Sequence, residues 1–569
     1  MSQPPGPYGP PGQQPSQGGP ADDPGVFGAP FEPRPGVYGQ PPAGPYGQPT
    51  ASYGYPQPPA PYGHPHPQPQ PTGPGGHGSP NGPTGPNGPR RRSRGRTAGL
   101  IAAVLAGVLV IGAGVWFAVG DGAGGEQPLA RESTGASTAP KRPSAPPGRT
   151  ITPAPKPADL NAKRRDGESR VLWVQENTVD LPGRGATQYG PWFAGDIVAK
   201  AMYRTVSGYS AADGTQKWSV AVRTRVCAAP TLPSPDGKIV VGLESGTTGE
   251  GECDRLQMVD LRTGKAGWST QFKREGVWDK LSDLTLAVNG DVLTVGRTGS
   301  ADAYRISDGK HLWDKVPGNC QPYGFTSGSV PLAATSCDTA ADDHAVQHVR
   351  RIDPATGREL WAYPVKKGFK VDQFYSTDPP VVSLRKGKER WGIVILNTDG
   401  SYRSQLVGNA GENYAPRCGK EMRPQNPNLD NCLGVAADTT TFYMAADGGE
   451  AGGVVAFDLA TGKSRWRVDA PAGQHPLPLR TEGGRVLVYL EATRANGSGR
   501  GGGIYALTPA GGALQPVLRH PDSASGVEGP FREATITYSG GRAVLMQEYV
   551  SGGDDKQEKA IVAMLAFGD

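Results

Sequence analysis

A short segment in which a glycine stands four residues before a tryptophan recurs five times in this chain. The copies end at Trp218, Trp268, Trp313, Trp361 and Trp466. The five glycines, from Gly214 to Gly462, are separated by 50, 45, 48 and 105 residues, and the last gap is about two periods. A repeat of roughly 40–50 residues with strand, turn and strand chemistry is typical of a β-propeller, in which each repeat forms one four-stranded sheet. The sequence therefore predicts an all-β fold.

Each copy has the pattern of a strand, a tight turn and a second strand, as in residues 256–272. The Thr-Gly or Asp-Gly at the tip supplies the positive φ that a hairpin turn requires. The tryptophan that follows is expected to bury its ring against the neighbouring sheet. We therefore interpret the five tryptophans as blade-packing residues rather than ligand-stacking ones. Deleting one such ring would cost about 3–5 kcal/mol if it is fully buried.

Weaker copies of the repeat fill the gaps, at residues 166–173, 397–406 and 509–514. Counted with them, the last strands of the blades lie near Trp173, Trp218, Trp268, Trp313, Trp361, Leu406, Trp466 and Leu514. The chain ends in three strand-like runs with no fourth, so the strand around Trp173 can complete the last sheet and close the ring. The expected fold is an eight-bladed β-propeller of four-stranded antiparallel blades. Seven blades are the alternative, if one weak copy is a loop insertion.

The N-terminal part has a different composition. Residues 1–89 are rich in Pro, Gly, Gln and Tyr and have few side chains to bury, so they are predicted to form a disordered cytoplasmic tail. Residues 98–119 hold no charge and would span about 33 Å as a helix, which matches a bilayer core of ~30 Å. They are predicted to form a transmembrane helix. Residues 120–165, rich in Pro, Ala and Thr, are expected to be an extracytoplasmic stalk that leads to a propeller at 166–569.

The basic juxtamembrane segment 90–97 predicts the topology. Its arginines are Arg90, Arg91, Arg92, Arg94 and Arg96. By the positive-inside rule they hold the N-terminus in the cytoplasm, so we expect a single-pass protein of the cell membrane with its propeller outside. A signal peptide is the competing interpretation, and the 89 preceding residues argue against it. Gly99, Ala103 and Gly107 lie four apart on this helix, a face through which a weak homodimer could form.

All six cysteines lie beyond the predicted span, which favours disulfides on the exported side. Cys227, Cys320 and Cys418 each follow the last strand of a repeat, and each has a second cysteine 14–26 residues later. Among the fifteen connectivities of six cysteines, we therefore expect the pairs Cys227–Cys253, Cys320–Cys337 and Cys418–Cys432. A metal site is the alternative, but no CxxC spacing occurs. The net charge of +5 is diffuse outside the arginine run, so no nucleic-acid partner is expected.

The repeat itself resembles a known family. The pattern Asp-x-x-Thr-Gly-Lys-x-x-Trp is complete in Asp260–Trp268 and Asp458–Trp466, and Asp353–Trp361 carries Arg for Lys. It is similar to the tryptophan-docking repeat of PQQ-like (quinoprotein dehydrogenase-like) propellers, over roughly residues 166–569. That family includes quinone-dependent dehydrogenases, the propeller lipoprotein of outer-membrane assembly, and extracytoplasmic sensor domains of bacterial membrane proteins.

The resemblance also implies what an enzyme of this family would need. Its dehydrogenases hold pyrroloquinoline quinone beneath a disulfide between adjacent cysteines, above a Ca²⁺ bound by Glu, Asn and Asp. Here the closest two cysteines have 13 residues between them. His344 and His348 have metal-like spacing without the Glu of an HExxH motif, and we expect a solvated acidic loop there. We therefore expect a non-enzymatic bacterial member, with no catalytic, cofactor-binding or metal-binding residues.

The predicted function is that of a membrane-anchored extracytoplasmic propeller, a binding scaffold or sensor for a protein, peptide or glycan at the cell envelope. Loops that join successive blades would bind the ligand, including the loops closed by cysteines. Propellers host many unrelated activities, so fold alone does not choose among them. The alternatives are a quinone-dependent dehydrogenase with an atypical site and a structural spacer.

Overall fold

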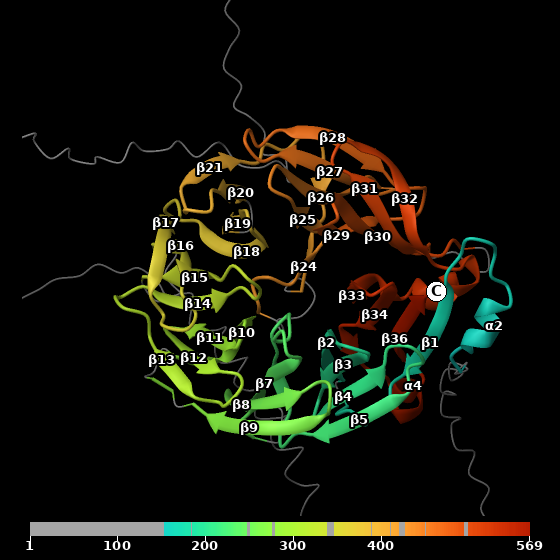
Figure 1. Ribbon diagram of the computed structural model, residues 1–569, viewed down its shortest axis with the longest axis horizontal. Helices are drawn as coiled ribbons and strands as arrows, with labels where there is room; N and C mark the ends of the chain where they lie inside the picture. The colour runs from blue at the N-terminus through green and yellow to red at the C-terminus, as the bar shows by residue number, and fades with distance from the viewer. Residues whose placement is uncertain are drawn as a thin grey trace, which may run out of the picture. The chain divides into compact units, whose positions relative to one another are not determined.

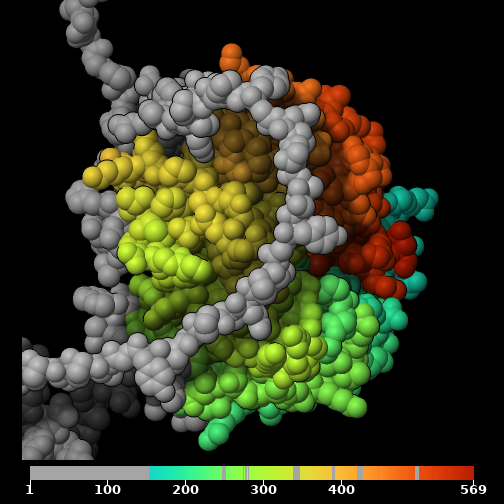
Figure 2. Space-filling view, turned by 60° about the vertical axis from the view of Figure 1, so that its left-hand side comes forward, coloured from blue at the N-terminus to red at the C-terminus, as the bar shows by residue number. Residues whose placement is uncertain are grey.

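The computed structural model describes residues 153–569, except for 184, 247–250, 273, 276–278, 338–345, 388–389, 410, 420–426, 450 and 494–498. These residues form eight antiparallel sheets that are arranged as blades around a central axis (Figure 1). In Figure 2 the colours follow one another from green through yellow and orange to red, as successive blades pack side by side. The prediction of eight blades is confirmed, and the seven-blade alternative is wrong.

Blades 1 to 5 each contain four consecutive strands, the first beside the axis and the fourth at the rim (Figure 1). Blade 1 contains β2 (Ala186–Ala194), β3 (Ile197–Met202), β4 (Thr205–Ser210) and β5 (Gln216–Ala221). Blade 2 contains β6 (Val226–Ala228), β7 (Lys238–Glu244), β8 (Cys253–Asp260) and β9 (Lys265–Gln271). Blade 3 contains β10 (Lys280–Asn289), β11 (Val292–Thr298), β12 (Ser300–Arg305) and β13 (His311–Asp314). Blade 4 contains β14 (Gln321–Phe325), β15 (Leu332–Ser336), β16 (Gln347–Ile352) and β17 (Glu359–Pro364). Blade 5 contains β18 (Lys370–Thr377), β19 (Pro380–Lys386), β20 (Arg390–Leu396) and β21 (Tyr402–Gln405).

Blades 6 to 8 carry additional short elements. Blade 6 contains β22 (Asn413–Tyr414), β25 (Val435–Ala437), β26 (Thr441–Asp447), β27 (Gly453–Asp458) and β28 (Ser464–Asp469), and between β22 and β25 the chain forms a separate pair, β23 (Arg417–Cys418) with β24 (Cys432–Leu433). Blade 7 contains β29 (Pro476–Glu482), β30 (Arg485–Leu490), β31 (Gly503–Thr508) and β32 (Gly511–Arg519). The helical turns η1 (Asp522–Ala524), α3 (Ser525–Glu528) and η2 (Phe531–Glu533) lead to blade 8, which contains β33 (Ala534–Ser539), β34 (Arg542–Gln547) and β36 (Val562–Gly568). Between β34 and β36 lie β35 (Tyr549–Val550), which pairs with β2, and the helix α4 (Asp555–Lys559).

The ring is closed by the two ends of the propeller. Strand β1 (Arg170–Glu176) pairs antiparallel with β36 and forms the rim strand of blade 8 (Figure 1). Trp173 lies opposite Ala566 in this pairing. The strand around Trp173 thus completes the last sheet, as the sequence predicts, and closure leaves blades 1 and 8 without an open edge between them.

The hydrophobic core lies between the blades. Each blade is packed between two neighbours, so the alternating side chains of its second strand are buried on both faces. In β7, for example, Ile239, Val240 and Val241 are all fully buried. The rim strands instead alternate between half-buried and exposed side chains, as in β9. Continuous apolar runs therefore mark the second strands, and alternating runs that contain tryptophan mark the rim.

The tryptophans of the repeat contact the turn glycine of the next repeat. A Cβ on Gly264 would lie 2.5 Å from Cγ of Trp218, so only glycine fits under the ring. The indole Nε1 groups donate hydrogen bonds to backbone carbonyl oxygens of the following blade: Trp173 to Ala211 (3.2 Å), Trp268 to Ile306 (2.7 Å), Trp313 to Pro354 (2.9 Å), Trp361 to Thr398 (3.0 Å) and Trp466 to Pro509 (3.0 Å). Among these rings only Trp173 is fully buried, at 3% exposure, and the others are half-buried at the rim beside solvent. The cost of deleting a rim tryptophan is therefore below that of a fully buried ring.

Residues 153–165, predicted from the sequence to belong to the stalk, pack against the propeller. Helix α2 (Pro157–Asn161) buries Leu160 in the same apolar cluster as Phe531. The side chain of Asn161 both donates to the carbonyl oxygen of Val171 (2.8 Å) and accepts from its N–H (2.9 Å). The body of the propeller thus begins before residue 166.

The predicted tail at 1–89, the basic segment 90–97 and the transmembrane helix 98–119 lie outside the described residues, with the arginines and the small-residue face they contain, and stay predictions. Within residues 153–569, apart from the gaps above, no helix is long and apolar enough to cross a membrane.

Candidate functional site

A segment of blade 6 occupies the centre of the ring. We call residues 427–433 the axial segment; it ends in β24, which lies near the axis in Figure 1. The disulfide Cys418–Cys432 and the backbone pairing of β23 with β24 join its end to Arg417 and Cys418. This arrangement sends one loop across the inner strands of several blades.

Asn428 and Leu429 attach the axial segment to four blades. The Asn428 side chain donates to the carbonyl oxygen of Ala229, beyond β6, at 2.8 Å and accepts from the N–H of Leu286, in β10, at 3.0 Å. The side chain of Leu429 lies over Gly324 of β14, where a Cβ would come within 2.5 Å of its Cδ1. Its carbonyl oxygen accepts from the N–H of Phe374 in β18, at 2.7 Å. Blades 2, 3, 4 and 5 therefore all contact these two residues.

Asp430 continues this bracing and carries an unused acceptor. Its Oδ2 accepts from the hydroxyl of Thr231 (3.0 Å) and from the N–H of Ser327 (2.6 Å). Its Oδ1 is buried and has no hydrogen-bond partner among the described residues. Burial raises the pKa of this carboxyl, and the hydrogen bonds to Oδ2 offset part of the rise. A buried carboxylate oxygen without a partner lowers the stability of the fold, because it loses its hydrogen bonds to water and gains none within the protein.

The hairpin formed by β23 and β24 is also attached to blades 7 and 8. The Arg417 guanidinium binds both carboxylate oxygens of Glu491, at 2.7 and 2.8 Å. The same guanidinium donates to the carbonyl oxygen of Arg532 at 2.5 Å. A two-pronged arginine–carboxylate pair fixes orientation as well as distance. The axial segment and its hairpin thus connect blades 2 to 5 with blades 7 and 8.

A cavity of about 170 Å³ lies beside the axial segment, and we call it the axial cavity. Inner strands and loops of blades 1, 2 and 8 form its walls, and residues at the end of the axial segment complete it. It is lined by Thr187, Gln188, Tyr189, Gly190, Trp192, Ala229, Pro230, Thr231, Gly419, Asp430, Asn431, Cys432, Leu433, Thr535 and Glu548.

The ionisable groups at the axial cavity are strongly perturbed. Burial, with the charge of Glu533 adding to it, raises the pKa of Glu548 to about 7. Burial also raises the pKa of the Tyr189 hydroxyl. Behind the wall, the ammonium of Lys200 donates to the side-chain oxygen of Gln188 at 2.6 Å, and burial lowers the pKa of Lys200 to about 7. Such clusters of perturbed groups in a cavity are candidates for a functional site.

The space at the axis does not fit a quinone cofactor. Cavities that hold drug-sized ligands have volumes of ~300–1,000 Å³, and the axial cavity has about 170 Å³. Four of its wall residues belong to the axial segment: Asp430, Asn431, Cys432 and Leu433. That segment is held in place by the hydrogen bonds and the disulfide described above. We therefore derive no chemical step through such a cofactor.

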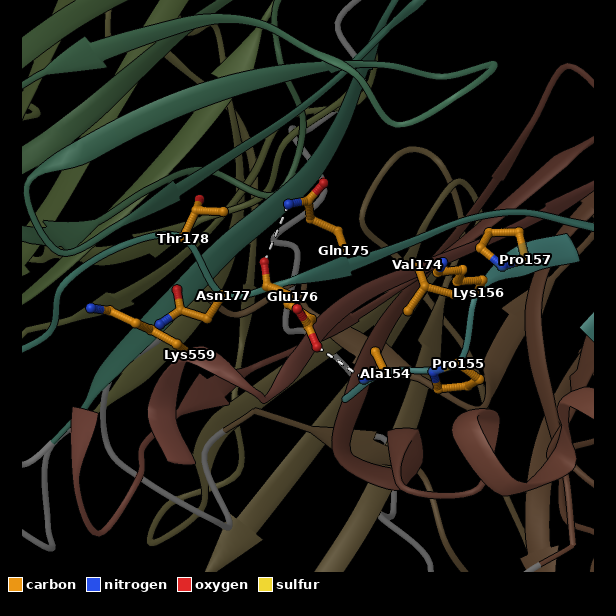
Figure 3. A pocket seen from close by; sticks show the side chains of 10 residues that line it. All are labelled: Ala154, Pro155, Lys156, Pro157, Val174, Gln175, Glu176, Asn177, Thr178 and Lys559. Carbon is orange, nitrogen blue, oxygen red and sulfur yellow. Dashed lines mark hydrogen bonds between the residues drawn. The ribbon is translucent and has the colours of Figure 1, made fainter. Parts of the chain in front are cut away.

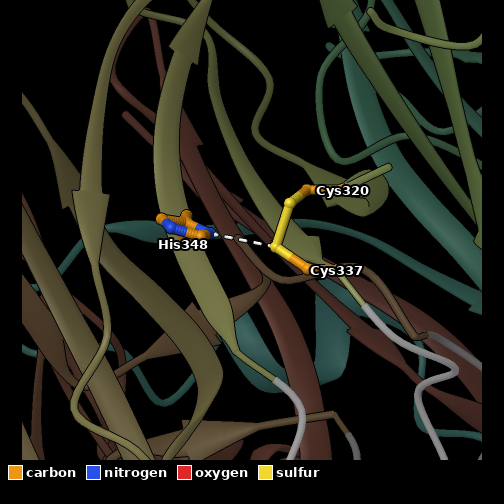
Figure 4. Close-up of side chains that lie close together, drawn as sticks. All are labelled: Cys320, Cys337 and His348. Atoms are coloured by element: carbon orange, nitrogen blue, oxygen red, sulfur yellow. Dashed lines mark hydrogen bonds between the residues drawn. A yellow bond between two sulfur atoms is a disulfide. The ribbon is translucent and has the colours of Figure 1, made fainter. Parts of the chain in front are cut away.

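The cysteines are joined as three disulfides: Cys227–Cys253, Cys320–Cys337 and Cys418–Cys432. Cys337 lies beside His348, whose Nδ1 is 3.5 Å from the Cys337 Sγ (Figure 4). The sulfur atoms of Cys320 and Cys337 and a ring nitrogen of His348 lie within 4.8 Å of one another, a spacing that a metal ion could use. In the disulfide neither sulfur is a thiolate, the form that binds metals. His344 lies outside the described residues, so its relation to His348 is not tested.

A second hollow lies where the N-terminal segment meets blade 8. Figure 3 shows Ala154, Pro155 and Lys156 near Val174 at one end, and Asn177, Thr178 and Lys559 at the other. Its volume is about 480 Å³. The Glu176 carboxylate accepts from the N–H of Ala154 at 3.0 Å and so fastens the segment to β1. Because the carboxylate of Glu176 already accepts this hydrogen bond, we do not take the hollow as the candidate site.

The residues that build the axial site were not singled out from the sequence, apart from Cys418 and Cys432. One feature of the sequence indicates an insertion between blades 5 and 6. The turn glycines of blades 5 and 6, Gly400 and Gly462, lie 62 residues apart, whereas the strong copies recur every 45–50 residues. The additional residues between these two glycines include β23, β24 and the axial segment. Nothing in its composition indicates that Asn428 and Asp430 would reach other blades.

Comparison with known proteins identifies a matching family model and a curated relative. A family model described as outer membrane protein assembly factor BamB matches residues 163–319, 205–383 and 346–547. BamB of Burkholderia pseudomallei (strain K96243) is 27% identical over 193 residues, which are 31% of this chain and 46% of that protein. The chain thus spans less than half the length of this curated relative.

Two solved structures match this chain at low sequence identity. BamB from Moraxella catarrhalis covers 70% of this chain with 100% of its own, at 14% identity and a TM-score of 0.38. Quinohemoprotein alcohol dehydrogenase from Comamonas testosteroni covers 72% of this chain with 77% of its own, at 14% identity and a TM-score of 0.39.

Proposed function

The chain belongs to the family of PQQ-like β-propeller repeats whose model is described as outer membrane protein assembly factor BamB, and we propose that it acts as an envelope scaffold that binds another envelope protein. The name of that family refers to assembly of other proteins, which a rigid binding surface can serve without a chemical step. Binding would rest on shape and charge complementarity. A peptide or glycan ligand is a narrower version of the same proposal.

The observation that carries this proposal is the bracing of the axial segment. Asn428, Leu429 and Asp430 contact loops or inner strands of blades 2, 3, 4 and 5, and Arg417 contacts blades 7 and 8. Loops fixed in this way lose little conformational entropy when a partner binds, which favours affinity.

Leu232 indicates where a partner would dock. It is 49% exposed, and it follows Thr231, whose hydroxyl binds Asp430 of the axial segment. Charged residues are depleted at the centres of interfaces, so an uncharged apolar side chain such as Leu232 is compatible with such a position. We therefore place the binding surface around Leu232 and the axial segment.

The predicted transmembrane helix at 98–119 would hold this surface outside the membrane, with the predicted tail in the cytoplasm. A single-pass anchor of this kind would place the propeller beside envelope proteins. Whether the anchor is retained can be tested by membrane extraction of the full-length chain with and without residues 98–119. Release of the deletion variant alone into the soluble fraction would support the anchor.

In-cell photo-crosslinking tests the scaffold. A photoreactive residue is placed at Leu232 and, as a control of similar exposure on the rim strand β17, at Leu360, which is 44% exposed. We expect one envelope protein to be captured repeatedly from position 232, not from 360, and to be lost when Thr231→Ala loosens the axial segment. Equal capture from both positions, or none, would favour a spacer.

A further inference from the structure

A groove of about 430 Å³ lies where the N-terminal segment meets the helical turns before blade 8, and we call it the apolar groove. Its apolar side chains come from Leu160 of α2, Val527 of α3, Phe531 of η2, and Ile561 and Val562 where β36 begins. Leu160 and Phe531 belong to one buried cluster, against which Val527 and Val562 pack. None of the described residues that line the groove carries a charge or is a histidine. The groove therefore suits an apolar occupant.

The two polar side chains among the described lining residues already have partners. The hydroxyl of Ser523 donates to the carbonyl oxygen of Leu160 at 2.7 Å. The side-chain amide of Gln547 donates to the carbonyl oxygen of Pro530 at 3.4 Å. Sites for polar small molecules hold their ligands with a few convergent hydrogen-bonding groups. Because these side chains are engaged within the protein, the groove favours an aliphatic side chain over a polar molecule.

The chain itself reaches the groove at Pro153. Pro153, Ala154 and Pro155 all line it, and residue 153 is the first that the structure describes. The N–H of Ala154 donates to the Glu176 carboxylate at 3.0 Å, which attaches this stretch to β1. The residues that immediately precede Pro153 therefore continue from the wall of the groove.

Ile151 is the aliphatic side chain that this connectivity brings to the groove. Residues 130–152 contain no other Val, Leu, Ile, Met or aromatic residue, and the next large apolar side chain along the chain is Leu129. Two residues of fully extended chain span about 7 Å at most, so the Cα of Ile151 lies within that distance of the Cα of Pro153.

The local sequence also indicates which way Ile151 faces. A residue that precedes proline is disfavoured from the helical region, so Thr152 is expected to be extended. In extended chain, residues two positions apart face the same side. Ile151 therefore continues the row of Pro153 and Pro155, which both line the groove, and Thr150 and Thr152 face the opposite side.

We propose that Ile151 occupies the apolar groove and attaches residues 149–152 to the propeller. Its burial removes apolar surface of both the side chain and the groove from water. A separate partner would lose translational and rotational freedom on binding, and a side chain that is already tethered at the wall of the groove does not. Docking of Ile151 fixes the point at which the predicted stalk leaves the propeller, beside blade 8. It also extends the N-terminal packing next to β1, the strand that closes the ring.

Site-specific photo-crosslinking in the purified full-length protein tests this proposal. An aliphatic amino acid that carries a diazirine and is similar in size to isoleucine replaces Ile151. Trypsin releases peptides 520–532 and 560–569, which contain the groove residues of α3, η2 and β36. We expect cross-links from position 151 in these two peptides of the same chain. The same amino acid at Thr150 is the matched control, because it lies one position away and faces the opposite side; these cross-links should be lost there.

Hydrogen exchange provides a second measurement that needs no photoreactive group. Ile151→Ser should speed amide exchange in residues 520–532, because the serine leaves the groove open to water. Leu129→Ser is the control, since it removes the other large apolar side chain before Pro153 at a position farther from the groove along the chain. It should leave exchange in residues 520–532 unchanged.

Four results would overturn the proposal. The first two are equal cross-linking of the groove peptides from positions 150 and 151, and equal exchange in the two serine variants. The third is cross-linking from position 151 to a second copy only, which a mixture of isotope-labelled and unlabelled protein identifies. The fourth is capture of a different protein, in place of residues 149–152, by a diazirine amino acid at Val527 in cells; the groove would then belong to a partner.

Discussion

The side-chain amide of Asn428 donates a hydrogen bond to the carbonyl oxygen of Ala229 at 2.8 Å, although the two residues are 199 positions apart in the chain. The same side chain accepts from the N–H of Leu286. One buried asparagine therefore satisfies two backbone groups of two different blades, at the centre of the ring where no strand pairing can reach them. This relationship makes the axial segment part of the fold rather than a loose loop.

Replacement of Asn428 by Ala should be strongly destabilising. It would leave the N–H of Leu286 and the carbonyl oxygen of Ala229 buried without partners, and each orphaned group costs about 1–3 kcal/mol. We expect the free energy of unfolding to fall by about 2–5 kcal/mol in urea titrations. Asn397→Ala is the control, because the Asn397 side chain binds Ser401 in an exposed turn. Equal losses in both variants would contradict the bracing role of Asn428.

The turn glycines can be tested for space separately from backbone conformation. Gly264 has a φ of +70° and lies under Trp218, whereas Gly290 has a φ of +61° and a Cβ added there would meet nothing within 4 Å. Gly264→Ala should therefore cost both left-handed strain, about 1 kcal/mol, and displacement of the tryptophan ring. Gly290→Ala should cost the strain alone. Thermal unfolding of the two variants measures the difference, and equal transition temperatures would show that the ring moves without cost.

The disulfide Cys418–Cys432 closes a loop with a sequence separation of 14. In the chain-entropy account, cross-linking a loop of ~15 residues stabilises by about 3 kcal/mol. The double variant Cys418→Ser/Cys432→Ser should lose about that amount, and it should become more sensitive to proteolysis near the axial segment. Cys227→Ser/Cys253→Ser is the comparison, since it opens a loop of another blade. Cleavage of both variants at the same sites would argue against a local effect.

Lys200 should give the stability of the protein a pH dependence. Burial lowers its pKa from 10.5 to about 7. Between these values the unfolded chain binds a proton that the folded protein lacks, so this group makes folding more favourable as pH rises through the window. Below pH 7 the penalty is present in full. Relative to Lys200→Met, the wild-type protein should gain about 1 kcal/mol per pH unit across that range, with about 1.36 kcal/mol as the limit.

Denaturant unfolding at a series of pH values measures this difference. Lys217→Met provides the control, because Lys217 is exposed on β5. Its profile should run parallel to that of the wild-type protein. A parallel profile for Lys200→Met as well would mean that Lys200 is hydrated in solution.

The sequence by itself determined the class of fold and indicated how the ring closes, and it predicted eight blades with seven as the alternative. These features rest on local chemistry that repeats: a turn glycine, a tryptophan four residues later, and apolar strands before and after them. Gly264 and Trp218 show why the inference works, since both lie in copies of the same motif and the contact between neighbouring copies recurs around the ring. Trp173 and Ala566 extend it to the two ends of the propeller.

Only the tertiary structure decided what lies at the axis. Asn428, Asp430 and Glu548 lie outside the repeated motif. Asn428 binds Ala229 and Asp430 binds Thr231, each across 199 residues of the chain, and Asp430 also binds Ser327 across 103 residues. Such contacts depend on how eight blades are oriented around a common centre, which no local pattern encodes. The same holds for the perturbed pKa values of Lys200 and Glu548, because burial is a property of the assembled ring. The repeated motif specifies the ring of blades. The residues at its centre lie outside that motif, and their contacts form only when the ring closes.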